Sequence, residues 1–237
     1  MSRISSGTPR QKRTSKHLVT KFGINTAFDP ECRDCKRLAT FLDQVRAKYP
    51  VYYAKPVAPF GAEQVPLLIV GLAPGMHGAN RTGRPFTGDY AGILLYETLH
   101  RFGFASHAGS DDPNDGLELK GCRITNAVKC LPPDNKPEPD EVRRCNRFLA
   151  AEIASCRPRA VLALGAIAHR AVLMALGLKP GPYAFAHGAQ HELPLPGGAS
   201  LRLFDSYHCS RYNTNTRRLT PAMFQAVFSD ISTFLSP

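Results

Sequence analysis

The sequence contains no apolar run close to the roughly 20 residues that a membrane-spanning helix needs. Its N-terminus also lacks the apolar core of a secretory signal peptide. The first absence excludes a protein anchored by transmembrane helices, and the second argues against secretion. We therefore expect a protein that works in the cytoplasm, without a membrane partner.

Acidic residues are scarce beside basic ones, with 19 Asp and Glu against 30 Lys and Arg, which gives a net charge of +11. The shortage is complete in residues 1–28, where six Lys and Arg stand without a single acid. Such an excess is typical of proteins that bind an acidic polymer, nucleic acid first and anionic membrane second. A protein that is merely basic and soluble remains the alternative. We expect residues 1–28 to be a flexible basic arm. A terminus without a specific role and an organellar transit peptide are the alternatives.

The common nucleotide-binding motifs are missing as well. Gly78 lies too far from Gly71 and Gly75 for Gly-x-Gly-x-x-Gly, and no Gly-Lys-Ser/Thr follows. The stretch 65–89 nevertheless combines an apolar run, a loop with five glycines and a helix start near Asp89. This combination favours a ligand cradle at the carboxyl end of a strand, since glycine lets the backbone approach a ligand. An ordinary strand-to-helix loop is the competing interpretation.

Apolar periodicity predicts strands that alternate with helices along residues 29–237, so we expect one α/β domain with a parallel sheet covered on both faces. The predicted strands are 67–70, 123–128, 160–164 and 201–206. The predicted helices are 31–48, one that carries Leu95, Leu99 and Phe102 on one face, 141–155, 166–176, and one that opens at Thr220-Pro221. Residues 177–200, rich in Gly and Pro, are predicted to be a loop. Ligands of such sheets lie outside the carboxyl ends of the strands.

The seven cysteines are an odd number, which argues against a secreted disulfide framework and for thiolate ligands in a reducing compartment. Cys32 and Cys35 form a tight pair, which we expect on one face of the first turn of helix 31–48. Cys130 and Cys145 form a looser pair across a proline-rich loop. Four thiolates suit an iron–sulfur cube, while a zinc site and plain buried thiols remain open.

Three further motifs complete the pattern: Gly-Leu-Ala-Pro-Gly (71–75) with Arg-Pro-Phe-Thr-Gly-Asp (84–89), Thr125-Asn126 before Cys130, and Tyr207-His208-Cys-Ser-x-Tyr-Asn213. From Cys32 to the C-terminus, the sequence resembles the uracil-DNA glycosylase superfamily, in particular its family 5 branch, the type B iron–sulfur enzymes of bacteria and archaea. The resemblance implies a three-layer αβα fold around a short, mostly parallel, four-stranded sheet. It also implies a monomer that hydrolyses the N-glycosidic bond of uracil in DNA, with a [4Fe-4S] cluster on Cys32, Cys35, Cys130 and Cys145.

The resemblance also implies roles for individual residues. Phe86 would stack on a base flipped out of the duplex, and Asn126 would pair with O4 and N3–H of uracil. His208 would donate a hydrogen bond to uracil O2, and Asp89 would orient the attacking water or offset positive charge on the sugar. The backbone between Ala73 and His77 would line the other carbonyl of the base, which adds the substrate-binding candidates Ala73, Gly75, Met76 and His77.

The segment 210–218 is basic and carries the candidate DNA contacts. Arg211 or Tyr212 would wedge into the duplex where the base has left, and Arg217 and Arg218 would hold phosphates. Asn213 would help to place water or phosphate. A solvated surface loop is the competing interpretation.

One departure from most of the superfamily concerns the first motif. No polar side chain stands in Leu72–Gly75, where many branches carry Asp or Asn at the place of Ala73, so the water-activating role falls on Asp89. Gly75 and Met76 replace a bulky Tyr of the strictest uracil enzymes, which predicts a roomier pocket that also accepts hypoxanthine. The rivals are the family 4 enzymes, which share the cluster, a catalytically silent DNA-binding module, and an electron-transfer protein.

Overall fold

The central sheet contains all four apolar runs that the sequence predicts as strands. In the computed structural model, which describes residues 28–236, the strand order is β2-β1-β3-β5-β4. The four predicted strands are β1 (Leu67–Gly71), β2 (Cys122–Asn126), β3 (Ala160–Leu164) and β5 (Ser200–Ser206), all mutually parallel. Every residue of β1 and β3 is buried, as expected of central strands covered on both faces. The predicted basic arm, apart from Phe28, lies outside the described residues.

The fifth strand corrects the prediction of four. β4 (Gln190–Pro194) pairs antiparallel with β5 inside the segment 177–200, which the sequence assigns to a loop. Only Leu193 of its five residues is buried. Because β4 is a short edge strand with polar side chains and a terminal proline, it has no apolar run by which a sequence pattern could detect it.

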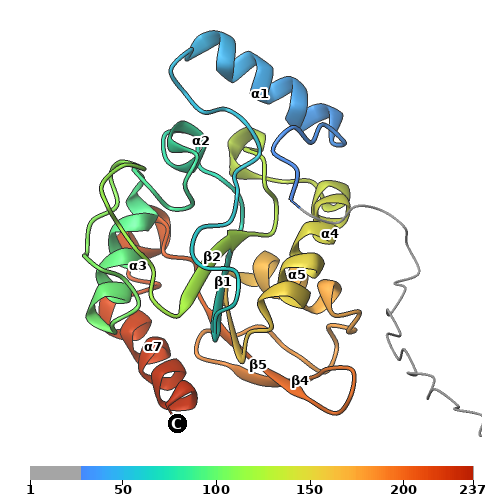
Figure 1. Cartoon of the computed structure of the whole chain (residues 1–237), viewed down its shortest axis with the longest axis vertical. Helices are drawn as coiled ribbons and strands as arrows, with labels where there is room; N and C mark the ends of the chain where they lie inside the picture. The colour runs from blue at the N-terminus through green and yellow to red at the C-terminus, as the bar shows by residue number, and fades with distance from the viewer. Residues whose placement is uncertain (1–27, 237) are drawn as a thin grey trace, which may run out of the picture.

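Helices cover both faces of the sheet, which confirms the three-layer αβα arrangement (Figure 1). The α3 and α7 helices lie on one face, α4 and α5 on the other, and α1 lies apart at the top of the view. The main helices are α1 (Lys36–Lys48), α3 (Tyr90–Arg101), α4 (Pro139–Cys156), α5 (Ala166–Ala175) and α7 (Pro221–Leu235). The short ones, which the sequence does not reveal, are α2 (Ala79–Thr82), η1 (Pro133–Asn135) and α6 (Arg211–Asn215). None of the helices in residues 28–236 is both long and apolar enough to cross a membrane.

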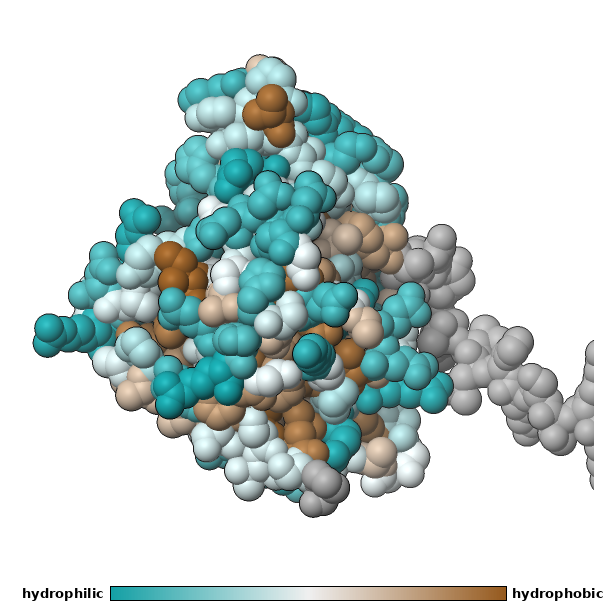
Figure 2. All heavy atoms as spheres, turned by 60° about the vertical axis from the view of Figure 1, so that its left-hand side comes forward, coloured by the Kyte–Doolittle hydropathy of each residue, from teal (hydrophilic) through white to brown (hydrophobic). Residues whose placement is uncertain are grey.

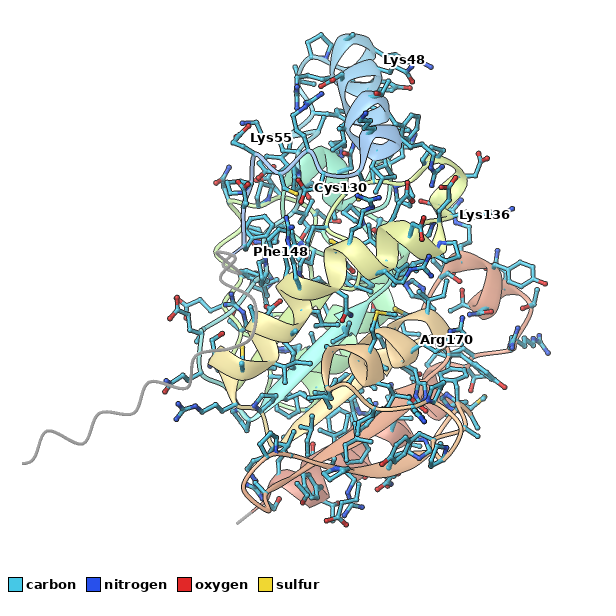
Figure 3. All side chains as sticks on the ribbon, turned by 90° about the vertical axis from the view of Figure 1, so that its right-hand side faces the viewer. Lys48, Lys55, Cys130, Lys136, Phe148 and Arg170 are labelled. Atoms are coloured by element: carbon cyan, nitrogen blue, oxygen red, sulfur yellow. The ribbon has the colours of Figure 1, made fainter. Side chains whose placement is uncertain are left out.

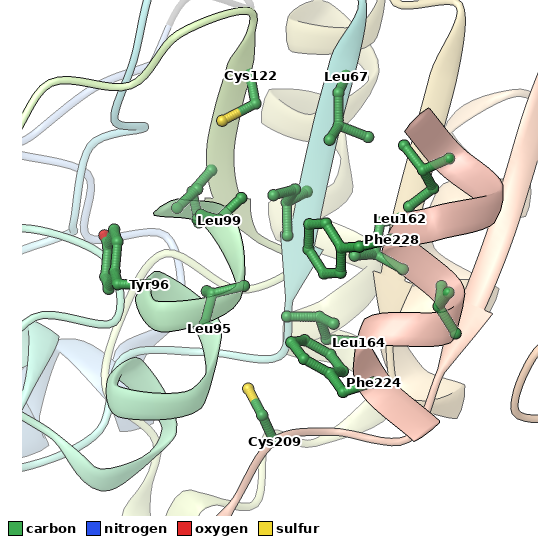
Figure 4. Packing of buried hydrophobic residues seen from close by; sticks show 14 of the residues in the cluster. Leu67, Leu95, Tyr96, Leu99, Cys122, Leu162, Leu164, Cys209, Phe224 and Phe228 are labelled. Carbon is green, nitrogen blue, oxygen red and sulfur yellow. The ribbon is translucent and has the colours of Figure 1, made fainter. Parts of the chain in front are cut away.

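Alternate side chains of β1 divide the core into two halves. Leu67 and Ile69 belong to the cluster under α3 and α7, where Leu95 and Phe228 point toward the sheet (Figure 4). Leu68 and Val70 belong to the cluster under α4 and α5. This alternation follows from the two-residue period of a strand. Because β1 packs into both halves of the core, the position of Gly71 at its end is fixed relative to the helices.

Helix starts agree with the sequence to within two residues except at α1. Thr220 caps α7 by accepting the N–H of Met223, as its position before Pro221 predicts. The α1 helix begins at Lys36 rather than at residue 31, so Cys35 is its N-cap residue and Cys32 precedes it. The prediction that both cysteines lie in the first turn is wrong, because Asp29 accepts the N–H of Glu31 and closes a separate turn there.

Candidate active site

A pocket of about 330 Å³ lies where β1, β2 and β5 end, within the size range of ligand sites. Its walls come from the loops that follow these three strands. The lining residues are Leu72, Ala73, Gly75, Ala79, Phe86, Asp89, Ala91, Asn126, Asn135, His208 and Ser210. We call it the base pocket. The parallel sheet therefore presents its strand-end loops to one cavity, as the order of strands and helices predicts.

Six of the predicted catalytic and substrate-binding residues line this pocket, and three do not. Those in the lining are Ala73, Gly75, Phe86, Asp89, Asn126 and His208. Met76 instead packs against the buried cluster beneath α1, and His77 accepts or donates a 2.8 Å hydrogen bond with the Tyr52 hydroxyl. Asn213 donates from Nδ2 to the backbone oxygen of His208 over 2.8 Å, so it contacts the pocket through its neighbour.

Phe86 and Asn126 are tightly packed side chains on the pocket wall. The Phe86 ring is 6% exposed, stacks on the His208 ring at 5.9 Å between centroids, and sits on a backbone with φ of +55°. The Asn126 Oδ1 atom is buried and has no hydrogen-bond partner within residues 28–236. A Cβ at Gly71 would lie 2.4 Å from that oxygen, so only glycine fits at the end of β1. The wall thus presents an aromatic face and a free acceptor.

Asp89 caps a helix with one carboxylate oxygen and directs the other toward the loop after β1. Its Oδ1 accepts the Gly92 N–H over 2.9 Å and caps α3. Its Oδ2 lies against Gly78 in the loop after β1. The two are so close that a Cβ added at Gly78 would be only 2.3 Å from this oxygen. Burial raises the pKa of Asp89 above its ordinary value, although the N–H groups of Gly92 and Ala91 act in the opposite direction.

His208 follows β5 and completes the pocket. Burial lowers the pKa of its imidazole to about 4, so the ring is neutral at physiological pH. A neutral imidazole carries one N–H donor and one acceptor nitrogen. The pocket therefore joins a half-buried carboxylate and a neutral imidazole, the pair that the sequence motifs place more than a hundred residues apart.

Sequence reasoning gave Arg84 no role, yet this buried guanidinium holds the Arg-Pro-Phe-Thr-Gly-Asp segment in place. It donates to Thr87 Oγ1 over 2.7 Å and to Ser110 Oγ over 3.0 Å, and it makes a bidentate pair with Asp115 at 2.9 and 2.6 Å. These contacts fasten the polar loop after α3 to the turn that positions Phe86. An arginine in a motif gives no signal about acceptors some thirty residues away, so the sequence could not reveal this network.

The four predicted ligand cysteines line a second cavity, which we call the cysteine pocket. It lies between α1, α4 and the segment after β2, where Figure 3 shows Cys130 below α1. Its lining residues are Cys32, Asp34, Cys35, Leu38, Ala39, Pro56, Val128, Lys129, Cys130, Arg144, Cys145, Arg147 and Phe148. The loose pair and the tight pair thus meet, although they are separated by some hundred residues in the chain.

The chemistry of this pocket fits a metal centre. Burial raises the pKa of Cys130, and the neighbouring thiols Cys145, Cys32 and Cys35 raise it further, so ionised sulfurs there require a cation. The backbone N–H of Lys129 donates to Cys145 Sγ at 3.3 Å, and the Arg147 guanidinium donates to Cys32 Sγ at 3.7 Å. A set of four sulfur ligands with backbone and guanidinium donors suits an iron–sulfur or zinc centre.

The predicted DNA contacts lie on and after α6, which directly follows Ser210 of the base-pocket lining. Ser210, in the pocket lining, caps α6 by accepting the N–H of Asn213, so the segment begins as a helix and not as a loop. Arg211 lies over the Tyr90 ring at 4.9 Å, and Tyr212 is 71% exposed. On the side that carries α3, hydrophilic side chains cover most of the surface, with hydrophobic ones in small areas between them (Figure 2).

The two arginines that follow α6 are also exposed. Arg218 lies over the Tyr207 ring at 4.5 Å, and Arg217 adopts a φ of +56° where the chain turns toward α7. A local contact thus holds Arg218, and both arginines have their charge in solvent.

Comparisons with known proteins point to one superfamily. The profile of the uracil DNA glycosylase superfamily matches residues 58–232. A type-5 uracil-DNA glycosylase of Thermus thermophilus is 45% identical over 205 residues, which cover 84% of this chain and 91% of the relative. One from Pyrobaculum aerophilum is 42% identical over 193 residues, covering 80% and 82%. A type-4 uracil-DNA glycosylase of the same archaeon is 32% identical over 149 residues, covering 62% and 68%.

Proposed function

The chain belongs to the uracil-DNA glycosylase superfamily, and we propose that it is a type-5 enzyme that hydrolyses the N-glycosidic bond of uracil in DNA and leaves an abasic site. The observation that carries this proposal is the presence of Phe86, Asp89, Asn126 and His208 in one pocket. Type-5 relatives match with higher identity and over more of the chain than the type-4 relative does, which favours the type-5 assignment over its rival.

The base is read after it leaves the stack, because its atoms are out of reach inside a duplex. Phe86 stacks on the flipped pyrimidine, which is worth roughly 1–3 kcal/mol. Asn126 accepts N3–H of uracil through its unpartnered Oδ1 and donates to O4. Cytosine presents an acceptor and a donor in the reverse order, so the same amide mismatches it.

Cleavage leaves negative charge on the departing base and positive charge on the sugar. His208, neutral because burial lowers its pKa to about 4, donates a hydrogen bond to uracil O2 and stabilises the charge that develops there. Asp89, which lines the pocket, orients the attacking water through its carboxylate and offsets the positive charge on the sugar. Asn213 fixes the His208 backbone, so it acts by positioning, a narrower role than direct placement of water.

The cysteine pocket holds a [4Fe-4S] cluster on Cys32, Cys35, Cys130 and Cys145. The donor set, the enclosing walls and the two donors to sulfur support this assignment. The cluster supplies covalent ties between the segment before α1 and α4. Excision by water transfers no electron, so the contribution of these ties is structural.

The absence of a large side chain at Ala73 and Gly75 supports a broader substrate range. Met76 and His77 lie outside the pocket lining, so neither narrows the space beside the base. The enzyme then excises hypoxanthine as well as uracil. A panel of duplexes, each with one uracil, hypoxanthine or xanthine, tests this, and cleavage confined to uracil rejects the broader range.

DNA is held by the surface around α6. Arg211 or Tyr212 enters the gap left by the base, and Arg217 and Arg218 bind phosphates. Replacing either phosphate-binding arginine by alanine reduces the salt dependence of DNA binding by about one unit of slope. The chain acts as a monomer through a single domain, residues 29–237. It works in a bacterial or archaeal cytoplasm, since the type-5 relatives come from bacteria and archaea.

The decisive experiment measures single-turnover excision from an oligonucleotide with one uracil, for the wild type, Asp89→Asn, His208→Ala and Glu97→Gln. Asp89→Asn and His208→Ala lose about 10²–10⁴-fold in rate while DNA binding persists, because each supplies acid–base or electrostatic assistance. Glu97→Gln, an exposed carboxylate change on the same helix, behaves as the wild type. A wild type without excision supports the silent DNA-binding module, and full turnover by Asp89→Asn reassigns the role of that carboxylate.

A further inference from the structure

A second group of metal-type side chains lies away from both pockets. His169 of α5, His191 of β4 and Asp205 of β5 place one ligand atom each within 4.8 Å of one another. Asp205 is fully buried and His169 is 1% exposed. None of the three lines the base pocket or the cysteine pocket, so the function proposed above leaves them without a task.

The two ring nitrogens of His169 both face oxygen atoms, so the ring needs a bound proton or metal ion in addition to its one N–H. Its Nδ1 lies 2.8 Å from Asp205 Oδ1, and its Nε2 lies 3.0 Å from the backbone oxygen of Tyr183. Both ring nitrogens thus face acceptors, whereas a neutral imidazole carries only one N–H. When Nε2–H is donated to the Tyr183 carbonyl, the lone pair of Nδ1 faces a carboxylate, and a proton or a metal ion must stand nearby. Histidines that bind metals usually donate their other N–H to a carbonyl or carboxylate in this way.

The contact between His191 and Asp205 points to the metal rather than to a proton alone. His191 Nε2 and Asp205 Oδ2 are both buried and lack a hydrogen-bond partner in the described part of the chain. They lie 3.4 Å apart, longer than the roughly 2.7–3.2 Å of an N–H···O bond. Two ligands bound to zinc at roughly 2.0–2.2 Å with tetrahedral geometry stand about 3.4 Å from each other. The separation therefore matches one edge of a zinc tetrahedron.

We propose that His169, His191 and Asp205 bind one zinc ion through Nδ1, Nε2 and Oδ2. Two imidazoles and one carboxylate form a ligand set that zinc accepts, and water would supply the fourth ligand. This site is separate from the four cysteines in sequence, in place and in ligand chemistry.

The zinc ties the edge of the sheet to the helix layer. β4 buries only Leu193, so hydrophobic contact alone gives this edge strand little support. The adjoining segment reaches the base pocket indirectly: Gly188 donates its N–H to the Asp205 carbonyl, and His187 stacks on Tyr207 at 5.1 Å. Tyr207 precedes His208. The ion thereby braces the backbone that leads into the base pocket, a positioning role and not a catalytic one.

The test uses the full chain with its iron in place. Zinc and iron are measured by mass spectrometry on one sample, and protein freed of zinc with its iron retained is then titrated with zinc chloride by calorimetry. The wild type binds one zinc per chain. His191→Asn and Asp205→Asn lose at least about 100-fold in zinc affinity, since even loss of an outer partner of a ligand typically costs 10–100-fold. Glu192→Gln, the exposed neighbour on β4, keeps wild-type affinity.

Iron content and thermal midpoint keep the outcome decisive. Because His191 is partly exposed on an edge strand, His191→Asn folds with full iron even where Asp205→Asn does not. Zinc raises the thermal midpoint of the wild type and of Glu192→Gln, but not that of His191→Asn. A wild type that takes up no zinc leaves a protonated His169 paired with Asp205 and overturns the site. If His191→Asn still takes up zinc, the ion belongs to the cysteines, and the proposed site is again overturned.

Discussion

The base pocket and the cysteine pocket begin from opposite ends of the same short segment, Asn126 to Cys130, yet they follow different physics. At the first end, Asn126 has a buried acceptor without a partner among residues 28–236, beside a carboxylate and an imidazole whose pKa values are shifted by burial. At the second end, sulfurs face one another between apolar walls, and the chain itself supplies donors to two of them. A site for a substrate that binds and leaves keeps polar groups without hydrogen-bond partners, whereas a site for a permanently bound group is closed around that group.

Lys129 connects the two regions. Its backbone N–H donates to Cys145 Sγ, and its buried ammonium reaches Thr125 Oγ1 and, at 3.2 Å, Glu152 Oε2. Thr125 directly precedes Asn126 on β2. The residue that supports a sulfur therefore also fixes the strand end that reads the base, so damage to the cysteine pocket reaches the base pocket through a few bonds.

The largest effect is expected at the cysteine pocket itself. Cys130→Ala removes one of four ligands from a closed site, so we expect colourless, poorly folded protein without excision. Iron content, visible absorbance and circular dichroism measure this. Cys156→Ala, a buried thiol outside the pocket, keeps its iron and serves as the control. Full iron and colour in Cys130→Ala would remove this cysteine from the ligand set.

The next effect is confined to the base pocket. In Gly78→Ala the new methyl group would lie 2.3 Å from Asp89 Oδ2, so the carboxylate must move. We expect about a 100-fold lower excision rate with normal iron content and DNA binding, since a shift of about 1 Å can have this cost. Gly181→Ala is the control, since no atom of the described residues lies within 4 Å of the added carbon.

A double variant sharpens the assignment of this effect. If Gly78→Ala acts only through the carboxylate, then adding it to Asp89→Asn lowers the rate no further. Rates that multiply in the double variant would show that the methyl group disturbs something other than Asp89.

A third change breaks the link between the regions. Lys129→Met removes the buried ammonium, although Glu152 keeps its 2.9 Å pair with Arg123. Loss of one partner from a buried ion pair costs about 3 kcal/mol, which for a chain of this size lowers the thermal midpoint by roughly 6–12 °C. Excision below that temperature falls only a few-fold, because Lys129 does not touch the base. Lys179→Met, at an exposed site, leaves both quantities unchanged, and a Lys129→Met protein with the same result would show that the two pockets are independent.

The sequence predicts the parts of this comparison that depend on local patterns. The sequence predicts β3 with its observed bounds because all five of its residues are apolar and buried. It also predicts the Thr220 cap, from the place of this residue before Pro221. The sequence does not predict β4, because a solvated edge strand has no apolar run. It places the start of α1 too early, because Asp29 closes a competing turn there. Such failures arise where polar side chains decide the backbone.

Long-range polar networks set the other limit of prediction. Arg84 finds its acceptors at Ser110 and Asp115, and Lys129 finds Glu152, only after the layers have packed. Family motifs named Asp89 and His208 for one pocket, but the distance of Met76 from that pocket depends on how the loop packs beneath α1. Motif position thus predicts which segments meet, and packing decides which side chains within them reach the site.

The smallest expected effect concerns stability, and it separates the two regions by pH. Burial raises the pKa of Asp89 in the folded protein above its unfolded value, so folding favours the protonated carboxyl, and stability is lost as the pH rises through the raised value. Asp89→Asn keeps the α3 cap, because asparagine caps as well as aspartate, and it removes this penalty. The variant should therefore melt above the wild type at neutral pH, and the difference should vanish on acidification below the ordinary pKa of an aspartate, about 3.9. Melting curves of both proteins across pH, with Glu97→Gln as a control whose difference stays constant, measure this. A variant that is less stable at neutral pH would mean that the hydrogen bonds to Asp89 outweigh its burial, and that the base pocket, like the cysteine pocket, stabilises the groups it holds.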